Sequence, residues 1–287
     1  MKYRKLGNRK MQMSAIGPDV GFVLFSPLGK REIMKKYILG IWMVCLASLV
    51  MAQTPKAEQV MNKKQQYIVE VAALVGKGDL TKLKPVLVAG LEDGMTVNEL
   101  KEVMVHSYAY CGFPRALRGL QTFVAVLNER KANGIEDKRG RKASPITDTR
   151  SKYERGRDIL AEISGAPVDA PKADYAVLAP EIEVFLKEHL FADIFERDVL
   201  TYGEREMATV AVLAAIGGVE PMMKSHIGIA LNVGVTPDEL RRLFIIVEKQ
   251  IGRGEADAGR MVLNEVLQSK GLITNPGTPV VVVENGV

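Results

Sequence analysis

Residues 95–117 read MTVNELKEVMVHSYAYCGFPRAL, and this stretch decides the fold class. It opens with Thr96, followed three residues later by Glu99, which is the capping-box pattern of a helix start. Apolar residues then recur at helical spacing until a Gly-Phe-Pro sequence interrupts them. The stretch therefore predicts a helix that runs to about residue 110, a break, and a further helix that runs to about residue 130.

The same pattern returns 140 residues further along the chain. Thr236 and Glu239 repeat the capping pair, Gly234 repeats the helix stop at Gly94, and Gly252 repeats the glycine of the break. These matches keep one register across about fifty residues, which indicates an internal duplication. We expect an all-α fold made of two tandem helical modules that pack as one duplicated unit.

The segments that lack the repeat set the remaining boundaries. The stretch KRGRKASPITDTR, residues 138–150, is charged, contains Gly and Pro, and shows no apolar period, which is typical of an exposed linker. The predicted divisions are residues 1–52 (extension and signal peptide), 57–135 (module one), 136–150 (linker), 151–275 (module two) and 276–287 (tail).

The composition is that of a globular protein, and the charge distribution argues against a nucleic-acid partner. Of the 287 residues, 47% are hydrophobic and 25% are charged, and the formal net charge is +5. Residues 1–52 alone hold nine basic and two acidic residues, so the rest of the chain has a net charge of −2. A near-neutral body predicts no nucleic-acid partner.

The N-terminal region has the pattern of an export signal. Lys35 and Lys36 precede the apolar run YILGIWMVCLASLVM, residues 37–51, and Ala52 supplies the small residue at a cleavage point. The run is shorter than the roughly 20 residues of a membrane span, although a retained single-span anchor stays open. We expect translation to start at Met34, cleavage after Ala52, and a periplasmic or secreted protein without membrane contact.

Cleavage at that point also removes Cys45 and leaves Cys111 as the single cysteine. An intramolecular disulfide would then be impossible, even in an oxidising compartment. Cys111 is left with two readings, a reactive thiol or a buried and inert residue.

Two strings resemble the carboxymuconolactone decarboxylase family, which includes the alkylhydroperoxidase D-like proteins. The first is the opening stretch quoted above, and the second is LTYGEREMATVAVLAAIGGVEPMMKSHIGIALNVGVTPDEL, residues 200–240. Together they cover most of residues 60–270. The resemblance implies alkylhydroperoxidase D-like helical modules, a small-molecule substrate, and homo-oligomers such as trimers or hexamers.

The chain departs from the family pattern in two ways. The peroxidase branch uses a Cys-x-x-Cys pair, and here Pro114 stands in place of the second cysteine, so the dithiol reaction looks unavailable. The family features are also split between the modules. His226 of module two is aligned with Val86 of module one, and the Tyr110-x-Gly-Phe-Pro sequence of module one has no copy in module two. The split suits one composite site, or one functional module beside a scaffold module.

Glu99, His106 and Tyr110 share one face of the predicted helix, next to Cys111. A carboxylate, an imidazole, a phenol and a thiol together could supply general acid–base chemistry to a small pocket. Each has a structural alternative, because Glu99 also fits helix capping, His106 an interface, and Tyr110 simple packing.

Three further residues complete the candidate site. His226 lies in an apolar helix and is either a catalytic acid–base group or a core residue. Arg115 could bind a substrate carboxylate, and Phe113 could line the substrate site, although an exposed Arg needs no function. His189 looks structural. The catalytic set is thus Glu99, His106, Cys111 and His226, and the substrate-binding set is Tyr110, Phe113 and Arg115.

Neither a metal-ligand pattern nor a nucleotide-binding glycine motif occurs, so we expect no metal and no cofactor. Three functions remain open: a cofactor-free enzyme acting on a small carboxylate or lactone, a single-cysteine thiol redox protein, and a non-catalytic binding or assembly protein. An exported location argues against the aromatic-degradation substrate of the cytoplasmic decarboxylases.

Overall fold

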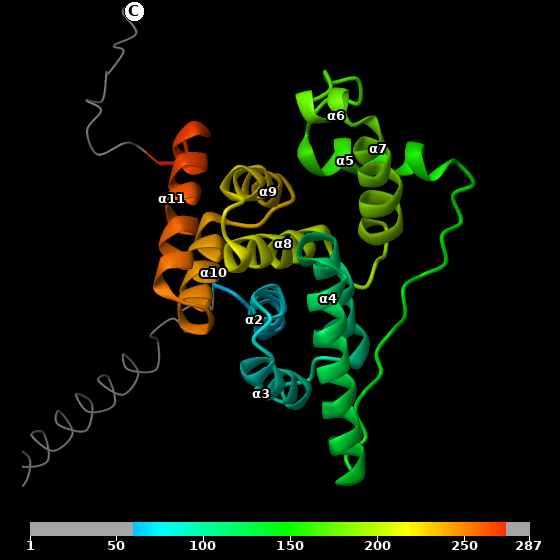
Figure 1. The fold of residues 1–287 in the computed structure, drawn as a ribbon, viewed down its shortest axis with the longest axis vertical. Helices are drawn as coiled ribbons and strands as arrows, with labels where there is room; N and C mark the ends of the chain where they lie inside the picture. Colours follow the sequence, from blue (N-terminus) through cyan, green and yellow to red (C-terminus); the bar gives the residue numbers. More distant parts are fainter. Residues whose placement is uncertain (1–59, 274–287) are drawn as a thin grey trace, which may run out of the picture. The chain divides into compact units, whose positions relative to one another are not determined.

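The computed structural model describes residues 60–273, and within this range the regular structure is entirely helical (Figure 1). The all-α prediction is therefore confirmed, while the predicted signal peptide and the tail beyond residue 273 lie outside the described residues. The elements are α2 (Lys63–Lys77), α3 (Leu80–Glu92), α4 (Val97–Ala132), α5 (Lys152–Ser164), α6 (Asp174–Leu178), α7 (Pro180–Phe185), the π-helix η1 (Leu186–Phe195), α8 (Tyr202–Ile216), α9 (Glu220–Asn232), α10 (Pro237–Gln250) and α11 (Arg253–Ser269).

Both predicted capping boxes are present. The Thr96 side chain accepts from the backbone N–H of Glu99, and the Glu99 carboxylate accepts from the backbone N–H of Thr96 at 2.9 Å. Thr236 and Glu239 make the same reciprocal pair at the start of α10. Each box satisfies helix N–H groups that would otherwise lack partners, which explains why these helices begin where the sequence predicts.

The predicted break in the helix is a kink. Gly112 adopts φ 77° and ψ 163°, a conformation that a residue with a Cβ rarely takes, and α4 resumes immediately after it. Pro114 sits in the first turn of the resumed helix, where a missing N–H does no harm. One long, bent element thus takes the place of two separate helices.

The main hydrophobic core forms around α2 and α8. α2 packs against α3, α4, α8 and α10, and Figure 1 shows it close to α8 at the centre of the helices. The contact is close because Gly76 has no side chain, and a Cβ placed there would lie 3.2 Å from Val212. Leu74 and Leu100 are fully buried in this core, and each contributes roughly 1.5–3 kcal/mol to folding.

A second, smaller cluster forms where α5 packs on η1. Its buried members are Ile163, Leu190, Phe191, Ile194 and Phe195. Gly156 allows the close approach, because a Cβ at this position would collide with the backbone carbonyl of Lys187. This cluster contacts α4, α8 and α9 through half-buried residues, so it borders the region described below.

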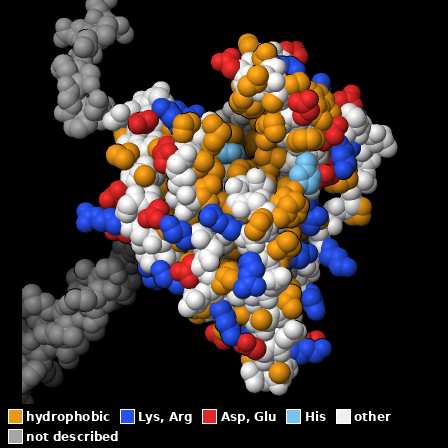
Figure 2. All heavy atoms as spheres, in the orientation of Figure 1, with side chains coloured by type: hydrophobic (Ala, Val, Ile, Leu, Met, Phe, Trp, Pro, Cys, Tyr) orange, Lys and Arg blue, Asp and Glu red, His pale blue; other side chains and the backbone are white. Residues whose placement is uncertain are grey.

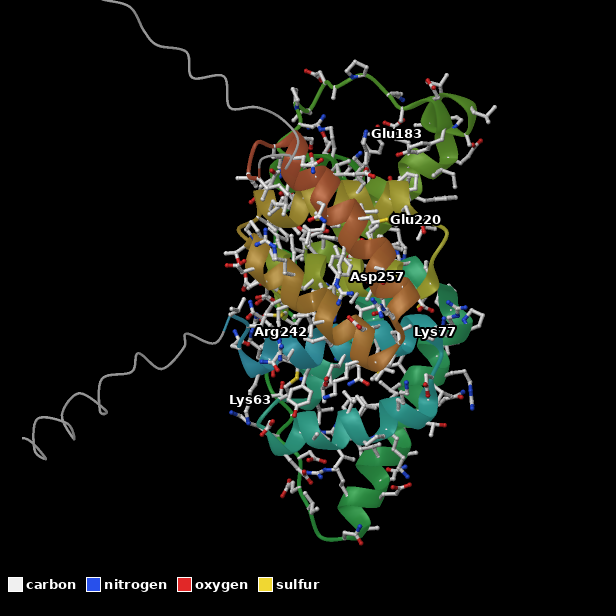
Figure 3. All side chains as sticks on the ribbon, turned by 90° about the vertical axis from the view of Figure 1, so that its left-hand side faces the viewer. Lys63, Lys77, Glu183, Glu220, Arg242 and Asp257 are labelled. Atoms are coloured by element: carbon white, nitrogen blue, oxygen red, sulfur yellow. The ribbon has the colours of Figure 1, made fainter. Side chains whose placement is uncertain are left out.

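Two helices before the linker correspond to two helices after it at an offset of 140 residues. α9 spans the residues of α3 shifted by 140, and α10 begins where α4 begins after the same shift. The linker itself has no regular structure, yet it is bonded to the rest of the chain: the carbonyls of Lys138 and Arg139 accept from the first turn of α4. Lys77, which lies in the last turn of α2 and is labelled in Figure 3, binds Glu255 of α11 at 2.7 Å.

Candidate functional site

A cluster of buried polar side chains lies between α4 and α8. On α4 its members are spaced four residues apart and therefore share one face. Burying so many polar groups is unfavourable unless they are bonded to one another, so such a cluster marks a candidate site. We call it the polar core; its buried members are Glu102 and His106 of α4 and Arg205, Glu206 and Thr209 of α8, and its partly buried members are Tyr110 of α4 and His226 of α9.

Glu102 anchors one end of the polar core. Its carboxylate accepts from Nη2 of Arg205 at 2.9 Å and from Nε and Nη2 of Arg197 at 2.8 and 2.9 Å. Burial alone would raise the pKa of Glu102, but the two guanidinium groups hold it below its usual value. The carboxylate is therefore charged and fully bonded, which fixes the position of Arg205.

His106 is fully buried and bonded on both ring nitrogens. Its Nε2 lies 2.8 Å from Oγ1 of Thr209, and that hydroxyl donates its own hydrogen to the carbonyl of Arg205 at 3.0 Å. His106 must then donate through Nε2, and its Nδ1 faces Nη1 of Arg205 at 3.4 Å. Burial, and next the charge of Arg205, hold the pKa of His106 well below its usual value, so the ring is neutral.

His226 occupies the opposite end of the polar core and, unlike His106, is within reach of solvent. Its Nδ1 lies 2.8 Å from Oε2 of Glu206, which is completely buried, while the His226 side chain remains 14% exposed. The carboxylate fixes Nδ1 as the donor and leaves Nε2 available to a ligand. The Tyr110 ring lies edge-on to His226 at 5.3 Å and 5.4 Å from His106, which links the two histidines.

Three buried polar atoms of the polar core have no hydrogen-bond partner among the described residues. They are the Tyr110 hydroxyl, Nε of Arg205 and Oε1 of Glu206. Burial, and then the charge of Glu206, raise the pKa of Tyr110 well above its usual value, so the hydroxyl keeps its proton. A proton donor and a carboxylate oxygen next to His226 can serve acid–base chemistry.

The structure brings only some of the predicted site residues together. His106, Tyr110 and His226 meet in the polar core. Glu99 instead makes its capping box and binds Lys64 at 3.2 Å, and hydrogen bonds from Thr96 and Lys64 hold its pKa below the usual value despite burial. These contacts favour the structural reading of Glu99.

The three residues around the kink face different surroundings. Burial raises the pKa of the Cys111 thiol, and the charge of Arg115 offsets this only in part. Arg115 donates to the carbonyl of Gly76. Phe113 is 63% exposed and stacks on Tyr108, with ring centroids 4.6 Å apart.

Sequence analysis did not single out the charged residues of the polar core as site candidates, although each of them leaves a signal in the sequence. Arg205 and Glu206 stand side by side before the apolar run 207–216, and a charged pair entering such a run predicts buried ion pairing. Glu102 lies one helical turn before His106 on the same face. Its partner Arg197 lies 95 residues away and leaves no local signal.

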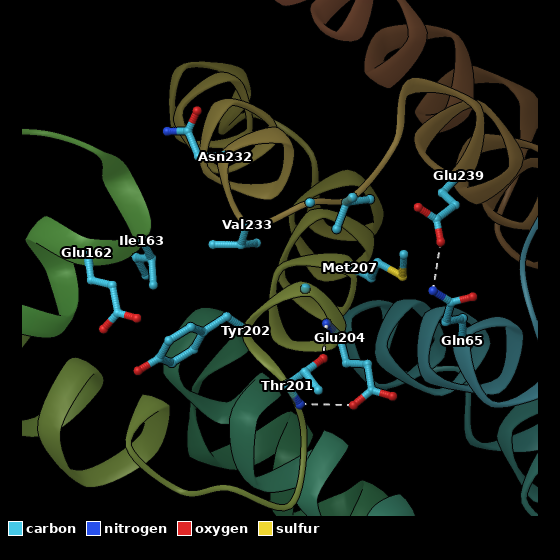
Figure 4. A pocket seen from close by; sticks show the side chains of 13 residues that line it. Gln65, Glu162, Ile163, Thr201, Tyr202, Glu204, Met207, Asn232, Val233 and Glu239 are labelled. Atoms are coloured by element: carbon cyan, nitrogen blue, oxygen red, sulfur yellow. Dashed lines mark hydrogen bonds between the residues drawn. The ribbon is translucent and has the colours of Figure 1, made fainter.

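A separate cavity of about 550 Å³ opens at the N-terminal end of α8 (Figure 4). Its polar side chains have structural roles: Thr201 caps α8 together with Glu204, and Gln65 donates to Glu239 at 2.7 Å. The predicted catalytic residues do not line it.

Among residues 60–273, no group of three His, Cys, Asp or Glu side chains could hold a metal ion, and no helix is long and apolar enough to cross a membrane.

Comparison with known proteins agrees with the sequence resemblance. Residues 180–255 match the sequence model of the carboxymuconolactone decarboxylase family. A 4-carboxymuconolactone decarboxylase from Acinetobacter baylyi is 25% identical over 122 residues, which are 42% of this chain and 90% of the relative. The segment 180–255 that matches the family model contains Arg205, Glu206 and His226, whereas Tyr110 lies outside it.

Proposed function

We propose that the chain is a carboxymuconolactone decarboxylase-like enzyme that acts without a cofactor on a small carboxylate or lactone. His226 is its general acid–base group, and Glu206 orients the ring. One observation carries this proposal: a buried carboxylate 2.8 Å from Nδ1 of a histidine whose side chain remains partly exposed. A carboxylate in this position fixes the tautomer, as in other acid–base histidines.

The chemistry of the substrate class explains why one such histidine would suffice. When a carboxylate on the carbon next to a lactone carbonyl leaves as CO2, the electrons of the broken C–C bond form an enolate. The enolate must then take up one proton, which protonated Nε2 of His226 can deliver, and solvent restores the proton to the ring. General acid–base catalysis of this kind contributes roughly 10²–10⁴-fold to a rate.

Tyr110 makes the proposed site composite. It comes from α4, in the first predicted module, whereas Glu206 and His226 come from α8 and α9 in the second. Its buried hydroxyl keeps its proton, so it can donate to a substrate oxygen. The complementary loss of motifs between the two proposed tandem modules fits such a shared site.

The test is turnover of a panel of carboxylated γ-lactones by the wild-type chain, His226→Gln and Glu206→Gln, followed as CO2 release. Both variants should lower kcat by about 100-fold or more. Glu265→Gln is the matched control, because the Glu265 carboxylate forms an exposed ion pair with Lys224, and it should keep the wild-type rate. Equal rates in His226→Gln and the wild type would contradict the proposal.

The remaining expectations accompany this function as proposals. Export is supported by the signal-like pattern of residues 34–52, and a trimeric or hexameric assembly by the family resemblance. The thiol redox alternative receives no support from Cys111, because burial raises the pKa of its thiol. A wild-type chain that binds the panel without turnover would favour the non-catalytic alternative.

A further inference from the structure

A row of aromatic side chains lies at the surface between α4 and η1. Tyr108 stacks on Phe113 at 4.6 Å, and the His189 ring lies edge-on to Tyr108 at 5.7 Å. Phe113 is 63% exposed, and the side chain of His189 is 51% exposed. Aromatic faces that remain open to solvent provide stacking surfaces for a flat ligand.

Tyr108 of the aromatic row and the end of α9, the helix that carries His226, border the same apolar wall. Tyr108 and Tyr110 both pack on the second hydrophobic cluster, and so do Ile229 and Val233 around the end of α9, the helix that carries His226. Figure 2 shows a hollow on this face of the molecule, with mainly hydrophobic walls and histidine side chains at its margin. A ligand in such a hollow can contact the apolar wall and the acid–base group together.

The cations next to the aromatic row are already engaged. Lys152 binds Asp193 at 2.8 Å, and the same carboxylate bonds to His189. Arg115, two residues from Phe113, donates to the carbonyl of Gly76. The described charges therefore offer little to the second carboxylate of a dicarboxylate, whereas the aromatic row offers stacking to a ring.

We propose that the ligand of this site carries a flat apolar ring, which packs against Tyr108, Phe113 and His189 while its single carboxylate or carbonyl group reaches His226. This inference rests on the proposed function for the placement of the reacting group. It selects aryl-substituted carboxylates or lactones over compact, hydrophilic dicarboxylates.

The test compares three ligands by titration calorimetry with the full chain: 3-phenylpropanoate, butanoate and pentanedioate. Phenylpropanoate should bind about tenfold more tightly than butanoate, as partial burial of a phenyl ring predicts, and pentanedioate should bind no better than butanoate. Phe113→Ala should reduce the phenyl preference to about twofold. Met261→Ala is the matched control, because Met261 on α11 is also 63% exposed, and it should keep the preference.

Several results would overturn the inference. These are no binding of phenylpropanoate, equal binding of phenylpropanoate and butanoate, or a phenyl preference that survives Phe113→Ala and disappears in Tyr202→Ala, which alters the cavity of Figure 4. His226→Gln separates the two proposals, since it should keep the phenyl preference while turnover is lost. A preserved preference with unchanged turnover in His226→Gln would leave the ring site standing and remove the proposed catalysis.

Discussion

Nδ1 of His106 lies 3.4 Å from Nη1 of Arg205, and both side chains are completely buried. A histidine in this position faces a cation, whereas His226 faces the carboxylate of Glu206. The two histidines therefore differ in what they can do: His106 is held neutral and orients Thr209 and Arg205, and His226 has one nitrogen available. This difference leads to a pH-dependent prediction.

The free energy of unfolding should decrease as the pH falls below about 6.5 because of His106. Burial and Arg205 lower its pKa in the folded chain, while the unfolded chain keeps the ordinary value near 6.5 and binds the proton first. The contribution is complete above 6.5 and declines by up to about 1.4 kcal/mol per pH unit below it. Urea unfolding at pH 5.5 and 7.5 should show a smaller pH dependence in His106→Gln, and an unchanged dependence would contradict the assignment.

Glu102→Gln should be strongly destabilising. It leaves Arg205 buried without its carboxylate, and breaking a buried ion pair from one side costs roughly 3–5 kcal/mol. Chemical denaturation measures this loss directly. Glu265→Gln is the control, because its ion pair with Lys224 is exposed on both sides and should change stability little; similar losses in the two variants would show that Glu102 has no special role.

Local sequence patterns predicted the helix ends that are stabilised by residues close together in the sequence. The capping boxes at Thr96 and Thr236 depend on residues three positions apart, so the helix starts could be placed from sequence. The π-helix η1 could not, because its packing depends on the close approach of Gly156 to the carbonyl of Lys187. A pattern within η1 does not report a contact made by another helix.

The residues of the candidate site could likewise be predicted from the sequence only in part. Tyr110, His106 and His226 could be proposed from residue type and helix face, and the structure does bring them together. Glu99 was placed with them because it shares their helix face, but its capping role and Lys64 hold it elsewhere. The ion pair between Glu102 and Arg197 is a long-range contact, which a single sequence does not encode in any local period.

Gly112→Ala should lower stability by about 1 kcal/mol or more, because Gly112 has φ +77° and alanine is strained there. Gly254→Ala is the control, since Gly254 lies in the first turn of α11, an added Cβ there would meet no atom within 4 Å, and its φ is not positive. It should be neutral or stabilising by up to about 1 kcal/mol. Thermal unfolding of both variants measures the two signs, and a stable Gly112→Ala would refute the kink.

The exported protein should begin at Gln53. The short apolar run before Ala52 predicts cleavage at that position. Mass spectrometry of the protein recovered from outside the cytoplasm gives the N-terminal residue. A mature chain that still contains Trp42 would refute cleavage and favour the retained anchor.

Cys111 should alkylate slowly at pH 7. Burial raises the pKa of its thiol, and only the thiolate attacks iodoacetamide, so the rate should be lower than that of a model thiol with a pKa near 8.5 and should rise with pH. His106→Ala should leave the rate unchanged, because both nitrogens of His106 are bonded to other groups and its ring is neutral. The measurement is the alkylation rate of the native chain by mass spectrometry, with the urea-unfolded chain as the reference for a fully accessible thiol. A native Cys111 that reacts faster than the model thiol, and slows in His106→Ala, would instead establish an activated cysteine and return the single-cysteine redox function to first place.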